Sequence, residues 1–265
     1  MASVSEPGPA PGVLEERHGP VAVLTLHHPE RRNALSAAIK RELADKLLAL
    51  SGDRECRAIV LAGSGGTFCS GGDINELRPM NFGEKRVKWT LHHQIIQLLL
   101  TGPKPVVAAV EGYAYGAGIS VAAACDHIVV ASNAQFSCAF IRMALLPDLG
   151  LRWTLSQRVG WAKAKQLAMF GTVFDGEEAG RIGLADRVVA PGQALAAAIE
   201  AAQQLAEQPG IAMALLKSAF ATRSGSLEEA LRADVDYSPV LAAAQDHEEA
   251  KRAFREKRKP RFTGD

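Results

Sequence analysis

The chain has 265 residues, of which 48% are hydrophobic and 22% are charged, and its formal net charge at pH 7 is +1. A chain of this length can form one large domain, or a domain with a smaller module. The small net charge provides no global field to recruit nucleic acid or an anionic membrane. No apolar run reaches the roughly 18–20 residues that a membrane span needs.

The first 12 residues contain three prolines and two glycines, and lack the basic and apolar parts of a signal peptide. We predict a flexible leader over residues 1–12. The four cysteines, Cys56, Cys69, Cys125 and Cys138, form no Cys-x-x-Cys pair. Reduced thiols in a cytoplasmic protein are therefore expected.

Strand-like and helix-like segments alternate over residues 13–191. β-branched and apolar residues predict strands at 20–27, 58–62, 105–110 and 127–131. Leucine and isoleucine at three- and four-residue spacing predict a helix over Ser36–Leu50, and a second helix is expected at 84–100. This alternation predicts an α/β core over 13–191, with functional loops at strand ends.

Strand signals end near Pro191. Helical segments, most of them rich in alanine, follow at 193–207, 210–222, 226–243 and 244–257. Alanine has a strong helix propensity but buries little apolar surface per residue. We therefore predict that residues 192–265 are a helical oligomerisation region that packs against another subunit.

Several familiar motifs are incomplete. Gly116-Ala-Gly118 lacks the third glycine of a dinucleotide fingerprint because Val121 occupies that place, and the turn Gly63–Gly66 is not followed by the Lys-Ser/Thr of a P-loop. The histidine pairs 27–28 and 92–93 are adjacent, which is a poor spacing for metal ligands on one helix face. These histidines are therefore expected to be structural.

Two glycine-rich segments, at 66–74 and 111–120, each follow a buried strand. Glycine lets a ligand approach the backbone, and free N–H groups at a helix start favour negative charge. Two such groups that converge on one oxygen form an oxyanion hole. Either segment alone is more simply interpreted as a turn.

The combination of motifs resembles the crotonase family, also called the enoyl-CoA hydratase/isomerase family, from about residue 13 to 262. The similar segments are Arg32–Leu35, Phe68–Ile74, Gly112–Gly118, Cys125-Asp126, Thr172–Arg187 and Phe254–Pro260. The resemblance implies an α/β fold, a spiral of ββα units with a C-terminal helical trimerisation region, assembled as a homotrimer or a dimer of trimers. It also implies an acyl-CoA thioester substrate that brings its own coenzyme A, with no metal and no bound cofactor.

The resemblance further implies oxyanion-hole N–H groups at Ser70 and Ala117. A backbone donor tolerates alanine at 117, where the family often has glycine, if φ permits. Other residues expected at the substrate or CoA site are Asn33, Ala34, Leu35, Gly71, Gly72, Asp73, Ile74, Gly116, Gly118, Ser120, Phe140, Phe254 and Lys257. Of these, the last two are expected to contact the adenine nucleotide across a subunit interface, and Phe82–His93 is expected to form a wall of the pocket.

Two positions depart from the hydratases of the family, which carry two glutamates that position water and move its proton. The aligned positions here hold Ser120 and Phe140. Neither side chain can act as a carboxylate base.

One carboxylate remains in a suggestive place. Residues 139–150 resemble the Phe-x-x-x-Gly-Leu-x-Pro-Asp-x-Gly pattern of crotonase isomerases, which shift a double bond with a single aspartate, here Asp148. Considered alone, Asp148 could instead cap the following helix. The resemblance favours a catalytic base. Ala144 replaces the usual glycine, and Leu151–Trp153 replaces small residues, so that a bulky Arg-Trp pair would reshape or occlude the pocket.

The leading hypothesis is therefore an enoyl-CoA isomerase that uses an oxyanion-stabilised enolate and one aspartate. The first alternative is an enoyl-CoA hydratase or lyase with displaced catalytic groups. The second is a non-catalytic acyl-CoA binding protein, which Ser120 and Phe140 permit.

Overall fold

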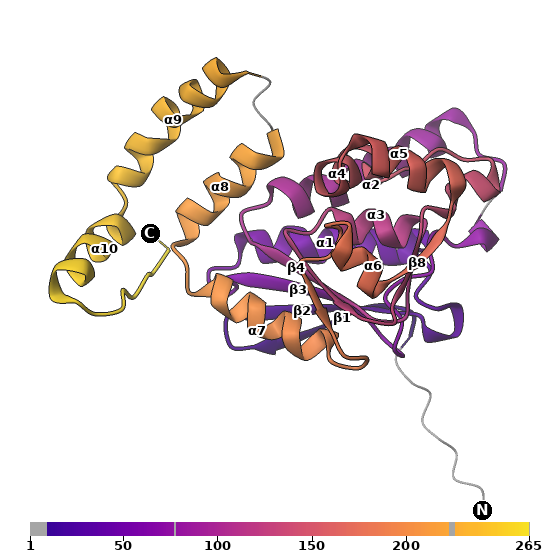
Figure 1. Ribbon diagram of the computed structural model, residues 1–265, viewed down its shortest axis with the longest axis horizontal. Helices are drawn as coiled ribbons and strands as arrows, with labels where there is room; N and C mark the ends of the chain where they lie inside the picture. The colour runs from indigo at the N-terminus through magenta and orange to yellow at the C-terminus, as the bar shows by residue number, and fades with distance from the viewer. Residues whose placement is uncertain (1–9, 77, 223–225, 265) are drawn as a thin grey trace, which may run out of the picture.

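The computed structural model describes residues 10–76, 78–222 and 226–264. Its main sheet has six strands in the order β1-β2-β3-β4-β6-β9 (Figure 1). These strands are β1 (Gly12–His18), β2 (Val21–His27), β3 (Ala58–Gly63), β4 (Val106–Val110), β6 (His127–Ala131) and β9 (Arg187–Val189). The first two form an antiparallel hairpin, and all other neighbours are parallel.

A smaller sheet holds β5 (Tyr113–Tyr115), β7 (Gln135–Ser137) and β8 (Val173–Asp175). Its first strand follows β4 after the turn at Gly112, where φ is +58°. A Cβ atom at this position would lie 2.4 Å from the Gly66 carbonyl oxygen. Only glycine therefore allows the chain to pass from one sheet to the other so close to the first glycine-rich segment.

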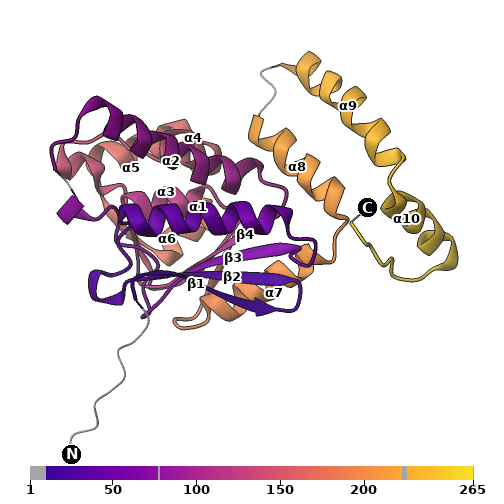
Figure 2. The same ribbon diagram turned by 180° about the vertical axis from the view of Figure 1, so that it is seen from behind.

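Helices cover both faces of the main sheet (Figures 1 and 2). On one face lie α1 (Ala37–Gly52), α2 (Phe82–Thr101) and α3 (Ala117–Ala123), and on the other lies α7 (Ala194–Ala206). Side chains of β2 alternate between the two layers: Leu24 belongs to the larger core with α1, whereas Val23 packs with α7. Burial on both faces explains the continuous apolar runs of the parallel strands.

The remaining short elements surround the ends of the strands. They are the 3-10 turns η1 (Pro29–Arg31), η2 (Ile74–Glu76) and η3 (Ala139–Met143), and the helices α4 (Leu151–Val159), α5 (Trp161–Phe170) and α6 (Gly176–Arg181).

The four predicted strands and two predicted core helices are all present. The hairpin strand β1 was not predicted, because its exposed second half is charged and breaks the apolar pattern. The expected leader lies largely outside the described residues, and β1 begins at Gly12.

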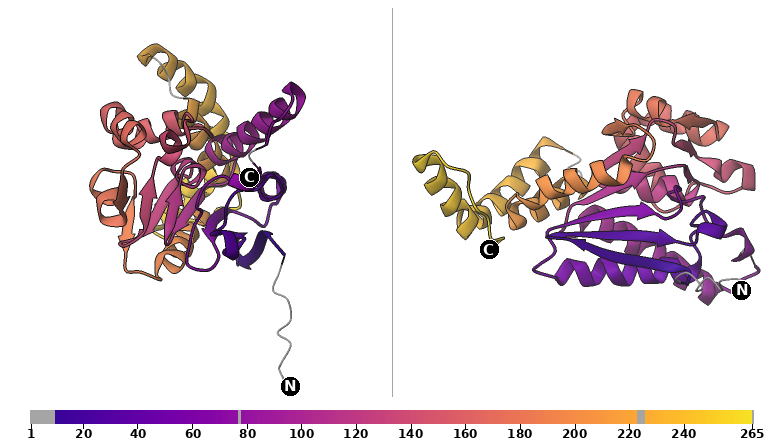
Figure 3. Two further views of the ribbon diagram at one scale, coloured as in Figure 1. Left: turned by 90° about the vertical axis from the view of Figure 1, so that its right-hand side faces the viewer. Right: turned by 90° about the horizontal axis from the view of Figure 1, so that it is seen from below.

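Three helices form an arm that projects from the α/β core (Figures 1 and 3). They are α8 (Gly210–Thr222), α9 (Leu227–Ala242) and α10 (Gln245–Glu256). Lys217 anchors the arm, because its Nζ donates to the carbonyls of Leu99 and Lys104 and pairs with Asp126 at 2.7 Å. The large exposed apolar side chains of the arm are Leu216, Phe220, Leu227, Leu231, Val235, Val240 and Phe254.

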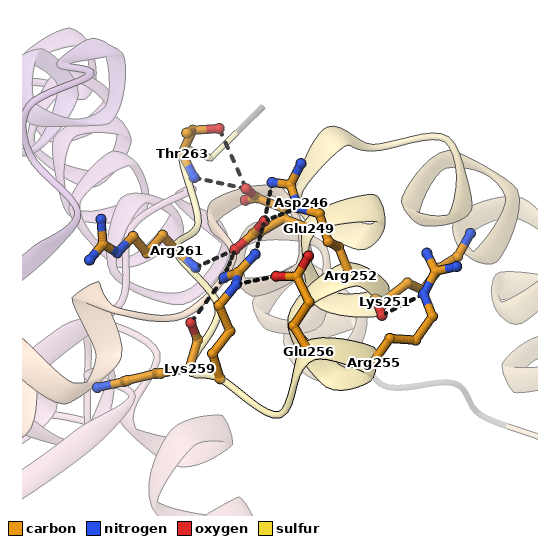
Figure 4. A network of polar contacts seen from close by, with 10 residues as sticks. Asp246, Glu249, Lys251, Arg252, Arg255, Glu256, Lys259, Arg261 and Thr263 are labelled. Carbon is orange, nitrogen blue, oxygen red and sulfur yellow. Dashed lines mark hydrogen bonds and ion pairs between the residues drawn. The ribbon is translucent and has the colours of Figure 1, made fainter.

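Two acidic residues hold the C-terminal segment against α10 (Figure 4). The Glu249 carboxylate accepts hydrogen bonds from the Arg258 guanidinium at 2.6 Å and from the Arg261 backbone N–H at 2.9 Å. Asp246 accepts from the Thr263 N–H at 2.8 Å. The bonds from Arg258, above all, hold the pKa of Glu249 well below its usual range.

Candidate active site

The two glycine-rich segments lie side by side. The Cys69 N–H donates to the Tyr113 carbonyl at 2.8 Å, and the Tyr115 N–H donates to the Cys69 carbonyl at 3.0 Å. A Cβ atom on Gly118 would lie 2.3 Å from the Cys69 carbonyl oxygen, so glycine is required for this approach. Because β3 and β4 are parallel neighbours, the two glycine-rich segments that follow them lie next to each other at the same edge of the sheet.

A cavity of about 530 Å³ opens where the segments meet, a size typical of small-molecule sites. The glycine-rich segments contribute Ser70, Gly71, Gly72, Asp73, Ile74, Tyr115, Gly116 and Ala117 to its lining. Leu35 and α1 line a second side, and the loop that carries Phe140 and Asp148 lines a third. The first half of α2 supplies another wall, as expected for 82–93, through Glu84, Val87, Lys88, Leu91 and His92.

The predicted donor at Ser70 is wrong, because this N–H is already engaged with the Arg32 carbonyl oxygen at 3.0 Å. The neighbouring Gly72 N–H is better placed. Leu35 donates to the Gly71 carbonyl and accepts from the Asp73 N–H, and this pairing turns the N–H of Gly72 away from Leu35. In the described part of the chain it has no hydrogen-bond acceptor.

The second donor position, Ala117, is the first residue of α3 and follows Gly116, whose φ is 51°. N–H groups in the first turn of a helix have no acceptor within the helix. None of the described residues accepts from the Ala117 N–H. A Cβ atom on Gly71 would lie only 3.8 Å from this nitrogen, which places the Ala117 amide directly beside the Gly71-Gly72 backbone.

Asp148 lies between η3 and α4. The N-cap of α4 is Gly150, and no side chain caps the helix, so the alternative of Asp148 as an N-cap is excluded. Its Oδ1 atom is buried and has no hydrogen-bond partner among the described residues. Burial raises the pKa of Asp148, while the positive charges of Lys40 and Lys88 oppose that rise.

The other three carboxylates that line the cavity are engaged. Asp73 accepts from the Arg31 guanidinium, and Glu76 accepts from the Ala37 N–H at the start of α1. Glu84 completes the capping box of α2. Asp148 alone among the four has a buried carboxylate oxygen with no partner.

The aligned hydratase positions offer no base. Phe140 is buried and lines the cavity with an apolar ring. Ser120 is buried outside the cavity lining, and its hydroxyl donates to the Gly116 carbonyl at 3.2 Å. Ser120 therefore supports the turn before α3 and does not face the substrate.

Three further residues that were predicted to contact the substrate do not line the cavity. The Asn33 side chain is buried and donates to the carbonyls of Ser64 and Thr67, while its oxygen accepts from the His28 N–H. Asn33, Ala34 and Gly118 are absent from the lining that the described residues form. Asn33 thus holds the loop between β2 and α1, and with it the position of the cavity-lining Leu35.

Phe254 and Lys257 lie on α10 and its C-cap, in the projecting arm, and do not line the cavity of their own chain. Phe254 is 86% exposed. Four neighbouring cations are paired with glutamates: Lys251, Arg252, Arg258 and Lys259. The Lys257 ammonium has no such partner in the part of the chain that is described.

The bulky residues after Asp148 do not occlude the cavity. Arg152 and Trp153 line a neighbouring cavity instead. The two cavities share three lining residues, His92, Asp148 and Leu149. These residues therefore lie at the junction of the two cavities.

The sequence did not point to Lys40 as a site residue, and His92, within the expected wall segment, was predicted to be only structural. Lys40 and His92 are buried, line the cavity, and approach one another to 3.4 Å between Nζ and Nε2. Burial, with the nearby positive charge of Lys40, lowers the pKa of His92 to about 3, so its imidazole is neutral. One signal in the sequence could have shown that Lys40 is buried. It lies three and seven residues before Leu43 and Leu47, and therefore on the same buried face of the helix.

Over residues 10–76, 78–222 and 226–264, the structure contains no cluster of three or more His, Cys, Asp or Glu side chains suited to a metal ion. None of the helices in these ranges combines the length and the apolar character that a bilayer span requires.

Comparison with known proteins agrees with this geometry. The profile of the enoyl-CoA hydratase/isomerase family matches residues 16–265. A Rhodobacter capsulatus protein named "Probable enoyl-CoA hydratase" is 39% identical over 245 residues, which cover 92% of this chain and 95% of the relative. The 1,2-epoxyphenylacetyl-CoA isomerase of Escherichia coli is 32% identical over 253 residues, with 92% and 95% covered.

The crystal structure of an enoyl-CoA hydratase from Polaromonas sp. JS666 matches with a TM-score of 0.89 at 33% identity, and the match covers 95% of this chain and 99% of that chain. The expected mixed α/β crotonase fold is thereby confirmed. The chain belongs to the enoyl-CoA hydratase/isomerase family, whose members act on acyl-CoA thioesters.

Proposed function

We propose that the protein is an enoyl-CoA isomerase in which Asp148 moves one proton along the acyl chain. The carboxylate removes a proton from C2 of a 3-enoyl thioester, and the electron pair moves onto the thioester oxygen as a dienolate forms. Asp148 then returns the proton to C4, which leaves the double bond between C2 and C3. The observation that carries this proposal is the half-buried Asp148, which lines the cavity and whose Oδ1 has no hydrogen-bond partner among the described residues.

The N–H groups of Gly72 and Ala117 would stabilise the dienolate oxygen. Neither group has an acceptor among the described residues, and both residues line the cavity that contains Asp148. Fixed donors at a developing oxyanion avoid the cost of reorganising solvent, and removal of one such donor typically costs about 10²–10³ in rate.

A single base is sufficient for this reaction, because proton removal and return occur on the same face of the acyl chain. Hydration requires in addition a held water and a proton donor. The two aligned hydratase positions supply neither function here, since Ser120 is engaged with Gly116 and Phe140 is apolar.

A hydratase with displaced catalytic groups is the second candidate, and the name of the Rhodobacter capsulatus relative favours it. The name of the Escherichia coli relative favours an isomerase. The candidates are separated by a turnover screen over 2- and 3-enoyl-CoA thioesters in deuterated water. An isomerase interconverts the two series and incorporates deuterium, whereas a hydratase accumulates the 3-hydroxyacyl product and an inert binder does neither.

The proposal also includes the oligomeric state of the protein. The apolar side chains exposed on the arm, such as Phe220, Leu231 and Val235, would be covered in a homotrimer or a dimer of trimers. Phe254 and Lys257 would then reach the CoA nucleotide bound to a neighbouring subunit. The four cysteines are free and buried, which suits the reducing cytoplasm.

A further inference from the structure

Lys40 and His92 form a buried pair whose role the proposed proton transfer does not use. Lys40 is 7% exposed and His92 is 3% exposed, and both line the cavity. Their nitrogen atoms Nζ and Nε2 are 3.4 Å apart. A lysine ammonium can only donate, so Nε2 of His92 accepts and the imidazole proton lies on Nδ1.

The Nδ1–H group of His92 is a buried donor with no partner among the described residues. Leaving such a donor unpaired destabilises the site, so a ligand that supplies an acceptor is favoured. The Trp89 ring meets the imidazole edge-on, with centroids 5.1 Å apart and an interplanar angle of 77°. Lys40 and Trp89 together hold the His92 ring, and a ligand oxygen that reached Nδ1–H from the cavity would supply the missing partner.

His92 also lies where a ligand would pass. Together with Asp148 and Leu149 it lines both the main cavity and the neighbouring one. An acyl group whose reacting carbons faced Asp148 would therefore lie close to His92. Asp148, whose Oδ1 also has no hydrogen-bond partner among the described residues, is the base that the proposed reaction uses.

We propose that His92, oriented by Lys40, is a specificity-determining hydrogen-bond donor that binds an oxygen on the acyl group of the substrate. The preferred thioesters then carry a carbonyl, hydroxyl or ether oxygen beyond the reacting carbons. This inference rests on the proposed function, because it takes the acyl group to occupy the Asp148 cavity.

The charges around His92 define which oxygen fits. The ring is faced by Lys40 from α1, by Lys88 and His93 from α2, and by Asp148 across the junction. Burial, helped by the nearby cations, lowers the pKa of His92 and keeps the imidazole neutral, so it donates as a neutral group. Lys40 and Lys88 would attract a carboxylate on the substrate and Asp148 would repel it, so these charges offset one another. The neutral N–H donor itself requires only an uncharged oxygen.

A purely hydrocarbon acyl group would cover the Nδ1–H donor without satisfying it. Sites built to bond a polar group reject analogues that lack the group far more strongly than apolar pockets reject a missing methylene.

The experiment measures equilibrium binding of hexanoyl-CoA and its 4-oxo, 5-oxo and 6-hydroxy derivatives. The proteins are the full-length wild type, His92→Leu, His92→Asn and Lys40→Met.

The wild type should bind at least one oxygenated thioester about 10-fold or more tightly than hexanoyl-CoA. His92→Leu should abolish this preference and bind hexanoyl-CoA more tightly than the wild type does. His92→Asn, which keeps an N–H near the Nδ1 position, should retain part of the preference. Lys40→Met should lose part of it, because Nε2 can then carry the proton.

Equal affinities of the wild type for all four thioesters would overturn the inference, and would mean that water satisfies Nδ1–H. A preference that survives in His92→Leu would also overturn it. Saturated thioesters undergo no double-bond shift, so these results stand even if Asp148 proves not to be an isomerase base.

Discussion

The Ser70 backbone N–H donates to the Arg32 carbonyl oxygen at 3.0 Å, which removes it from the set of free donors in the cavity. Leu35 pairs with the residues on both sides of Gly72, and the Gly72 N–H has no acceptor among the described residues. The proposed oxyanion hole therefore combines Gly72 with Ala117.

Ala117→Pro should lower kcat by about 10²–10³, because it deletes a single N–H that faces the thioester oxygen. Proline is compatible with the first position of a helix, so α3 should still form. Ala117→Gly is the matched control and should retain most of the activity. Equal kcat values for the two folded variants would remove Ala117 from the mechanism.

Gly72→Ala provides a second control. A Cβ atom at Gly72 meets no heavy atom within 4 Å, and the N–H is kept, so activity should change little. Gly71→Ala should instead destabilise the protein, since φ is +115° there and the new Cβ would lie 3.1 Å from the Tyr115 carbonyl oxygen. Thermal unfolding of the two variants separates these effects.

The regular elements could be predicted from the sequence because apolar periodicity reports burial directly. The helix beginning after Ser36 and the four buried strands follow from such patterns. The hairpin strand β1 could not be predicted in this way, since an edge strand with one exposed half lacks the alternation. The motif resemblance located the segments of the active site.

Individual atoms of the site could not be assigned from the sequence. Which of the N–H groups in the Phe68–Ile74 segment is free depends on the Ser70–Arg32 hydrogen bond, a contact across 38 residues of chain. The role of Asn33 likewise depends on its carbonyl partners in a distant loop. Lys40 and His92 meet only because α1 and α2 pack together.

The rate of isomerisation should fall as pH decreases through the pKa of Asp148, because only the ionised carboxylate accepts a proton. Burial raises that pKa above the ordinary aspartate value of 3.8. Lys40→Met removes a positive charge that holds the pKa down, so the acidic limb should move to higher pH. A pH profile of kcat/KM with the same midpoint in both proteins would contradict this coupling.

Asp148→Asn should not lower the melting temperature at neutral pH, and should raise it slightly. A carboxyl whose pKa is raised on folding favours the folded state when protonated, and this contribution is lost as pH rises through the folded pKa. At neutral pH the ionised Asp148 therefore opposes folding. A clear drop in melting temperature would indicate a structural role for the carboxylate instead.

The arm should mediate assembly. Phe220 and Val235 are 80% and 71% exposed in the single chain, and burial of such side chains contributes about 1.5–3 kcal/mol each. Phe220→Asp with Val235→Asp should dissociate the oligomer, as measured by sedimentation velocity. Leu48 is the control, because it is an exposed residue of α1 and lies outside the arm. Leu48→Asp should leave the assembly unchanged.

Lys257→Gln should weaken CoA binding several-fold, with a loss that shrinks at high salt, because the proposed contact pairs an ammonium with the anionic CoA nucleotide. Lys259→Gln is the matched control, since Lys259 is already paired with Glu207 at 2.7 Å. Calorimetric titration with CoA compares the two. Equal effects of both substitutions would reduce the role of Lys257 to general surface charge.

The central claim is that Asp148 is the base, and solvent exchange tests it most directly. Wild-type and Asp148→Asn proteins are incubated with a 3-enoyl-CoA in deuterated water, and deuterium at C2 and C4 is followed by NMR. We expect the wild type to incorporate deuterium at both carbons, and Asp148→Asn to lose exchange and isomerisation by about 10²–10⁴ while still binding the thioester. Exchange at an undiminished rate in a folded Asp148→Asn protein would contradict the mechanism.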